Sequence, residues 1–264
     1  MTILDEIIEY KRGVVATAQK ACSIEALKKQ INLSKPFYSL MDIMSDDTNF
    51  HFICEVKKAS PSKGIIQPNF NPTAQAKLYE KGGASAISVL TDEKYFMGSL
   101  EYIKSIKKTL HLPILRKDFI IDTYQIYESK LAGADLILLI ARILTKEQLN
   151  KHYELAKELK MEVLIEIADL DDIDKIPNKL DKVIIGINNR NLHTFEVSLQ
   201  NSVNLKPLLP QGLPVISESG IHTADDCKLL LDHGFRGALI GESLMRSDSP
   251  VELLQQMKRA VTYV

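Results

Sequence analysis

The chain has 264 residues, of which 45% are hydrophobic and 25% charged, a balance typical of one soluble globular domain or at most two small ones. Lysine and arginine total 33 against 34 aspartate and glutamate residues, and the net charge of −1 gives no overall field that would attract nucleic acid or an anionic membrane. We therefore expect no nucleic-acid or membrane partner, and any anion must be bound by a local site.

The three cysteines, Cys22, Cys54 and Cys227, lie far apart and form no CxxC pair. Dispersed cysteines in odd number are typical of free thiols in a reducing compartment, and no apolar run approaches the roughly 18 residues of a membrane span. The histidines are equally dispersed, without the spacing of metal ligands. A cytoplasmic protein is the expectation.

Residues 1–50 precede the repeating part of the chain. Ile3, Leu4, Ile7 and Ile8 form one helical stripe, and Ser23 can cap a second helix that ends at Gln30. No glycine- and serine-rich linker follows. We predict that residues 1–50 are a helical extension packed on the remainder, residues 51–264, within one structural domain.

From residue 51 onward, short apolar runs alternate with amphipathic segments. Each run is too short for a helix, and most are rich in isoleucine, valine and leucine, as expected for parallel strands covered on both faces. The eight predicted strands are HFICEV (51–56), SAISVL (85–90), LPILRK (112–117), DLILLI (135–140), EVLIEI (162–167), KVIIGI (182–187), LPVISE (213–218) and GALIGE (237–242).

Helical patterns follow most of these strands, at 72–83, 99–110, 123–133, 145–160, 223–234 and 250–261, and several end at a glycine such as Gly82, Gly133 or Gly234. The connections around 169–180 and 198–209 have weaker helical patterns. Eight strand-then-helix units predict an α/β fold, a (β/α)8 TIM barrel over residues 51–264. A doubly wound open sheet is the competing architecture, but neither GxGxxG nor GxxxxGK[ST] follows any strand.

Polar residues end five of the predicted strands, each on the face that apolar residues occupy earlier in the strand. Inward positions at the strand ends open onto the C-terminal mouth of a barrel, where barrel enzymes place their active sites. Lysines and carboxylates gathered there would tune one another's pKa values for acid and base roles, although a structural polar layer is the alternative. The residues are Glu55, Lys57, Lys117, Glu166, Asn188 and Glu218.

The loops after strands seven and eight, SESGIHTADD and LIGESLMRS, predict a phosphate site. Gly220 and Gly241 let backbone N–H groups approach an anion closely, and these two loops commonly bind phosphate in barrels. The loop after the first strand, KKASPSKG, places Ser60 above the same mouth, and its length suits a mobile lid or a plain surface loop.

At these residues the sequence closely resembles the indole-3-glycerol-phosphate synthase family of tryptophan biosynthesis. The matching stretches extend over essentially the whole predicted barrel, and the N-terminal ILDEIIEYKR is similar to the helical extension of the family. The stretches are CEVKKASPSKGII (54–66), SVLTDEKYFMGSL (88–100), LPILRKDFIIDTYQIYES (112–129), GADLILLIARIL (133–144), GINNRNLHTFEV (186–197), SESGI (217–221) and LIGESLMR (239–246).

The resemblance implies a cofactor-free carboxy-lyase, with no metal, that converts 1-(2-carboxyphenylamino)-1-deoxyribulose 5-phosphate to indole-3-glycerol phosphate, carbon dioxide and water. By motif, Lys117 would be the general acid, Glu166 would assist dehydration, and Lys57 would hold the substrate carboxylate. Glu55, Asn188 and Glu218 would orient these groups.

The resemblance also implies the residues that bind the substrate. Those around the anthranilate ring would be Pro61, Phe96, Phe119, Leu139 and Leu192, with Arg190 nearby. The phosphate would lie on Ser219, Gly220, Gly241 and Glu242, with Ser60 contributing from the first loop.

Two alternatives stay open at this point. One is a phosphoribosyl aldose–ketose isomerase on the same barrel, which would share the phosphate loops but use another acid and base pair. The other is a non-catalytic barrel that binds a sugar phosphate. A small phosphorylated molecule is the expected partner in each case, and a monomer is the expected assembly.

Overall fold

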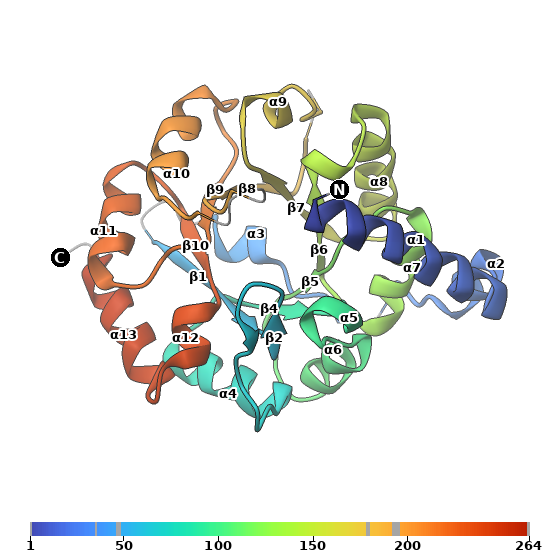
Figure 1. Ribbon diagram of the computed structural model, residues 1–264, viewed down its shortest axis with the longest axis horizontal. Helices are drawn as coiled ribbons and strands as arrows, with labels where there is room; N and C mark the ends of the chain where they lie inside the picture. Colours follow the sequence, from blue (N-terminus) through green and yellow to red (C-terminus); the bar gives the residue numbers. More distant parts are fainter. Residues whose placement is uncertain (1, 35, 46–48, 178–179, 192–195, 263–264) are drawn as a thin grey trace.

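The computed structural model describes residues 2–34, 36–45, 49–177, 180–191 and 196–262, and it contains a closed barrel of eight parallel strands ringed by helices (Figure 1). Consecutive barrel strands are neighbours, and β10 pairs with β1 to close the barrel. This confirms the predicted (β/α)8 barrel, and no predicted strand boundary differs by more than two residues. The barrel strands are β1 (His51–Val56), β4 (Ala86–Leu90), β5 (Ile114–Lys117), β6 (Leu136–Ile140), β7 (Glu162–Ile167), β8 (Val183–Asn188), β9 (Val215–Glu218) and β10 (Gly237–Ile240).

The six stronger helical patterns are also confirmed. They form α4 (Pro72–Gly82), α6 (Leu100–Lys107), α7 (Thr123–Ala132), α8 (Lys146–Glu158), α11 (Ala224–Asp232) and α13 (Pro250–Ala260). Gly133, with φ of 95°, caps α7 as predicted, but α4 is capped by Gly83 rather than Gly82, which lies in the last turn against Leu254. The two weak patterns contain only the short helices α9 (Leu170–Ile173) and α10 (Gln200–Leu205), the latter continued by the 3₁₀ turn η2 (Lys206–Leu208).

Short elements that the sequence patterns did not predict surround the mouth of the barrel. A hairpin of β2 (Ala59–Ser60) and β3 (Gly64–Ile65) follows β1, and α5 (Glu93–Phe96) follows β4. The 3₁₀ turn η1 (Ala141–Ile143) follows β6, and α12 (Glu242–Arg246) follows β10. They are too short to show a hydrophobic period, so no pattern of residues predicts them.

The N-terminal helices cover both ends of the barrel. α1 (Ile3–Ala21) begins at Thr2, whose side chain accepts the Asp5 N–H, and reaches the mouth, while α2 (Ile24–Gln30), capped by Ser23 as predicted, lies beside α7 (Figure 1). α3 (Leu40–Ile43) closes the opposite end: Glu162, at the start of β7, accepts the Leu40 N–H at 2.9 Å.

The strands are buried on both faces, which explains their continuous apolar runs. An inner cluster fills the barrel, and an outer cluster lies between the strands and the surrounding helices. All three cysteines are free thiols. Within the described ranges, no helix combines the length and apolarity that crossing a bilayer requires.

Candidate active site

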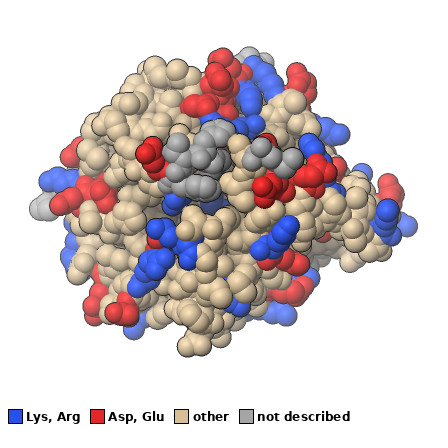
Figure 2. Space-filling view, viewed as in Figure 1, with Lys and Arg blue, Asp and Glu red and all other residues tan. Residues whose placement is uncertain are grey.

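A cavity of about 380 Å³ opens at the carboxyl ends of the barrel strands, a size in the range of pockets for small molecules. Lysine and arginine side chains gather around the centre of this face (Figure 2). Fifteen of the predicted site residues line the cavity, which confirms their convergence although not their roles. They are Glu55, Lys57, Ser60, Pro61, Phe96, Lys117, Phe119, Glu166, Asn188, Arg190, Glu218, Ser219, Gly220, Gly241 and Glu242.

Two predicted substrate residues are not among them. Leu192 lies outside the described residues. The prediction for Leu139 is wrong: this side chain belongs to the outer core, whereas its neighbours Leu138 and Ile140 line the cavity. Successive side chains of a strand point to opposite faces, so the inward positions of β6 are Leu136, Leu138 and Ile140. Strand parity alone would have identified them.

Lys117, the last residue of β5, lies between two carboxylates carried by other strands. Its Nζ is 3.1 Å from Glu166 Oε2, at the end of β7, and 3.0 Å from Glu218 Oε2, at the end of β9. Burial disfavours the ammonium, but the charges of Glu166 and Glu218 outweigh this and raise the pKa of Lys117.

Glu218 lies directly over the backbone of Gly186 in the neighbouring strand β8. A Cβ at Gly186 would overlap the Glu218 carboxylate, so only glycine leaves room for it. Burial raises the pKa of Glu218 to about 7, with Lys117 opposing and Glu166 adding to the shift. Among the described residues its buried Oε1 has no hydrogen-bond partner. This carboxyl can therefore hold or release a proton near neutral pH.

A second ion pair joins Glu55, near the end of β1, to Lys57, whose Nζ is 2.5 Å from Glu55 Oε1. Burial opposes the charge of Glu55, but Lys57 and Lys117 outweigh it and lower the carboxyl pKa. A Cβ at Gly241 would overlap the Glu55 carboxylate and crowd Lys57. Gly241 is therefore needed for close packing of this pair against the loop after β10.

Asn188, at the end of β8, orients its neighbours through both ends of its amide. Its Nδ2 donates to Glu166 Oε1 at 3.0 Å, and its Oδ1 accepts the Arg190 N–H at 3.0 Å. The first bond fixes the Glu166 carboxylate, whose other oxygen faces Lys117. The second turns the chain so that Arg190 lines the cavity.

The predicted anion site lies where the loops after β9 and β10 meet. Ser219 and Gly220 have φ of 66° and 79°, a sharp left-handed turn that costs about 1 kcal/mol or more for a residue with a Cβ. Such strain is often kept where a functional site needs it. The Ser243 hydroxyl ties the two loops together by donating to the Ile221 carbonyl at 2.9 Å.

Cationic side chains surround the same part of the cavity. The Glu242 carboxylate lies 3.8 Å from Lys63 Nζ, 3.9 Å from Arg190 Nη2 and 3.2 Å from Arg246 Nε. Lys63 and Arg190 also line the cavity. Positive charge and exposed backbone thus occur together, as recognition of a phosphate requires.

The opposite wall is apolar. Phe96 and Phe119 have ring centroids 6.1 Å apart and planes inclined at 40°. Ile3, Leu4 and Ile7 from α1 also line the cavity. Their stripe was visible in the sequence, but the surface against which it packs was not, because a periodic pattern does not specify a partner.

Comparison with known proteins gives a consistent result. A family model described as indole-3-glycerol phosphate synthase matches residues 4–257. An indole-3-glycerol phosphate synthase of Legionella pneumophila (strain Paris) is 44% identical over 256 residues, covering 97% of this chain and 98% of the relative. The Bacillus pumilus (strain SAFR-032) protein of the same name is 49% identical over 205 residues, covering 78% of this chain and 82% of its own length.

A solved structure of the tryptophan synthase subunit alpha from Legionella pneumophila str. Paris has a TM-score of 0.61 and covers 84% of this chain and 96% of its own. At 13% sequence identity this likeness concerns the barrel fold alone. The family match and the Legionella relative extend along nearly the entire sequence, including every element that contributes to the cavity. The chain belongs to the indole-3-glycerol phosphate synthase family.

Proposed function

We propose that this chain closes the indole ring of 1-(2-carboxyphenylamino)-1-deoxyribulose 5-phosphate and releases carbon dioxide, water and indole-3-glycerol phosphate. The observation that carries the proposal is the position of Lys117, held between Glu166 and Glu218 in a cavity with an apolar wall and a cationic loop region. An aromatic ring, a reacting ketose and a phosphate need these three environments together.

Ring closure forms a bond between the ring carbon that bears the carboxylate and the ketose carbonyl carbon. Negative charge then develops on the carbonyl oxygen, and Lys117 stabilises this charge and donates the proton. The raised pKa of Lys117 keeps it an ammonium at neutral pH. Glu166 and Glu218 hold that ammonium in place from two sides.

Loss of carbon dioxide returns the bonding electrons to the ring and restores its aromaticity. Loss of the new hydroxyl as water then completes the indole. Lys57 binds the departing carboxylate, and Glu166 assists the proton transfers of dehydration. Glu55 orients Lys57 through their 2.5 Å contact, and Asn188 orients Glu166. Glu218 positions Lys117.

Substrate binding divides between the two sides of the cavity. The anthranilate ring lies against Phe96, Phe119 and Pro61, with Leu138 and Ile140 in the place expected for Leu139. The phosphate binds the backbone of Ser219, Gly220, Gly241 and Glu242, with Ser60 and Arg190 beside it. We also propose a single structural domain, monomeric and cytoplasmic, supported by the part that α1 takes in lining the cavity and by the free thiols.

Lys117→Ala tests the proposal. Turnover of the carboxyphenylamino ribulose phosphate should fall by about 10² or more, the usual contribution of a general acid. Because the chain contains no tryptophan, the indole fluorescence of the product is measured without background fluorescence from indole side chains of the protein. Lys104→Ala, at an exposed lysine of α6, is the control and should keep wild-type turnover. Turnover of Lys117→Ala near that of the wild type would reject the role.

A further inference from the structure

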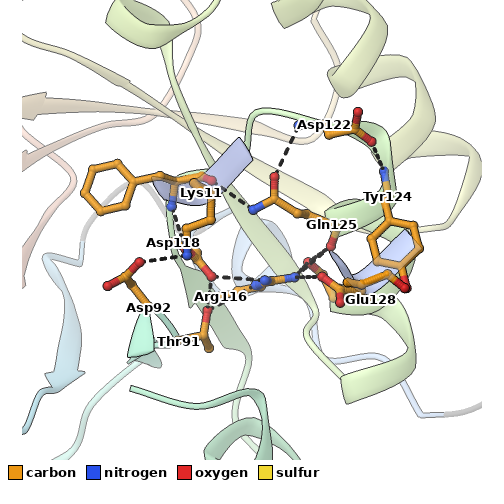
Figure 3. Close-up of polar contacts among 12 residues, drawn as sticks. Lys11, Thr91, Asp92, Arg116, Asp118, Asp122, Tyr124, Gln125 and Glu128 are labelled. Atoms are coloured by element: carbon orange, nitrogen blue, oxygen red, sulfur yellow. Dashed lines mark hydrogen bonds and ion pairs between the residues drawn. The ribbon is translucent and has the colours of Figure 1, made fainter. Parts of the chain in front are cut away.

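A second buried charge cluster lies beside the active site and joins α1 to the barrel (Figure 3). Lys11, in the middle of α1, places its Nζ 2.7 Å from Asp92 Oδ2 and 2.8 Å from Asp118 Oδ1. The Lys11 side chain is only 5% exposed and the two carboxylates are essentially inaccessible. A lysine is rarely buried to this extent unless its charge is compensated, as it is here by two acids.

The other half of this cluster is contributed by the barrel. Arg116 on β5 donates to Asp118 Oδ2 at 3.0 Å and to the Thr91 hydroxyl at 3.1 Å. It also donates to the Gln125 carbonyl of α7 at 2.8 Å. Asp118 therefore contacts two cations, Lys11 and Arg116, and a further acid, Glu128, lies 3.6 Å from Arg116 Nη1 at the partly exposed edge of the cluster.

Each acid that Lys11 contacts also fixes a segment of the active site. Asp92 caps α5 by accepting the Tyr95 N–H at 2.7 Å, and α5 carries Phe96. Asp118 directly follows Lys117 and accepts the Phe119 N–H at 2.8 Å. One ammonium from α1 thus joins the two segments that carry the aromatic pair and the central lysine.

The charges of Lys11 and Asp118 persist over a wide pH range. Burial disfavours the Lys11 ammonium, but Asp118 and Asp92 outweigh it and raise the pKa of Lys11. Burial likewise opposes the Asp118 carboxylate, but Arg116 and Lys11 lower its pKa below its usual range. The contact of Lys11 with Asp118 is therefore an ion pair throughout the neutral range.

We propose that Lys11 is a positioning residue of the active site, which acts through Asp92 and Asp118 to hold the aromatic wall and Lys117 in their reactive arrangement. The inference rests on the proposed roles of Phe96, Phe119 and Lys117. A displacement of about 1 Å in such groups can reduce turnover by about 10². A lysine that only attached α1 would affect stability and leave the kinetics of the folded enzyme unchanged.

The test compares Lys11→Met with Lys20→Met, which removes an exposed lysine from the same helix. Both full-length proteins are assayed well below their unfolding temperatures. For Lys11→Met we expect kcat to fall about tenfold and KM to rise about tenfold. The inhibition constant of the indole product should rise by a similar factor, while that of inorganic phosphate, which does not contact the aromatic wall, stays within about twofold.

Two further variants keep the test decisive. Lys11→Arg retains the charge and should recover part of the lost turnover. Lys11→Met combined with Asp92→Asn removes one charge of each sign, leaves the net charge of the cluster unchanged, and preserves an N-cap for α5, because asparagine also caps helices. It should fold and still show the kinetic defect.

Wild-type kcat, KM and product inhibition in a folded Lys11→Met or double variant would overturn the proposal. Failure of both variants to fold would also overturn it, since Lys11 would then be structural. Lys117→Ala separates this inference from the proposed function: full activity of that variant would refute the assigned chemistry, whatever the Lys11 variants do.

Discussion

Two buried charge clusters lie side by side in the molecule, and their acids differ in charge state. Around Lys11, the cations Lys11 and Arg116 contact Asp92 and Asp118. A third acid, Glu128, lies 3.6 Å from Arg116 at the partly exposed edge of the cluster. Arg116 and Lys11 outweigh the effect of burial and lower the pKa of Asp118, so this acid stays ionised and suits a fixed joint between α1 and the barrel.

The cluster at the mouth has three carboxylates, Glu55, Glu166 and Glu218, in contact with the ammonium groups of Lys57 and Lys117. Burial, reinforced by the charge of Glu166, outweighs Lys117 and raises the pKa of Glu218 to about 7. Glu218 can therefore exchange a proton near neutral pH. The charge state of a buried acid thus separates a structural cluster from a reactive one more clearly than burial does.

The strongest challenge to this comparison is Asp118→Asn. It leaves Lys11 and Arg116 with one acid fewer, and an uncompensated buried charge costs about 3 kcal/mol or more. The free energy of unfolding, measured by urea denaturation at pH 7, should fall by that amount. A loss below about 1 kcal/mol would show that Lys11 and Arg116 do not depend on Asp118 for charge compensation.

Glu218→Gln should have the opposite effect at the mouth. The pKa of Glu218 is raised in the folded state, so its contribution to stability is complete below the unfolded pKa of about 4.5 and is lost as the pH rises to about 7. Glutamine cannot ionise and avoids this loss. The variant should gain stability relative to the wild type by about 3 kcal/mol between pH 4 and pH 8, while turnover falls.

Paired unfolding curves across that pH range measure the effect. A difference between variant and wild type that does not change with pH would mean that Glu218 ionises normally. The comparison with the Lys11 cluster would then fail, because the buried acids Glu218 and Asp118 would not differ in charge state near neutral pH.

Arg12→Gln should have the smallest effect, although Arg12 is adjacent to Lys11. Arg12 pairs with Glu9 at 2.8 Å, but both side chains are exposed, at 66% and 71%. Such pairs contribute about 0–1 kcal/mol because solvent screens them. If the urea midpoint shifts by the equivalent of more than about 1 kcal/mol, the loss of stability depends on where a side chain lies along α1 rather than on how deeply it is buried.

The sequence by itself determined the barrel and the residues at its mouth. Short, continuous apolar runs between amphipathic segments left few architectures open, and strand parity brought Glu55, Lys117, Glu166, Asn188 and Glu218 to one end. The prediction that Leu139 binds the substrate was wrong because strand parity was not applied to it. The family followed from motifs spread over the whole barrel and is confirmed by the family match over residues 4–257.

Only the tertiary structure decided where α1 lies and what Lys11 does. A helical stripe states which face is buried but not against which surface, and Lys11 is separated from Asp92 and Asp118 by many intervening residues. The charge state of Glu218 also depends on the arrangement of groups around it. Local patterns follow from neighbours in the chain, whereas burial and charge balance follow from neighbours in space.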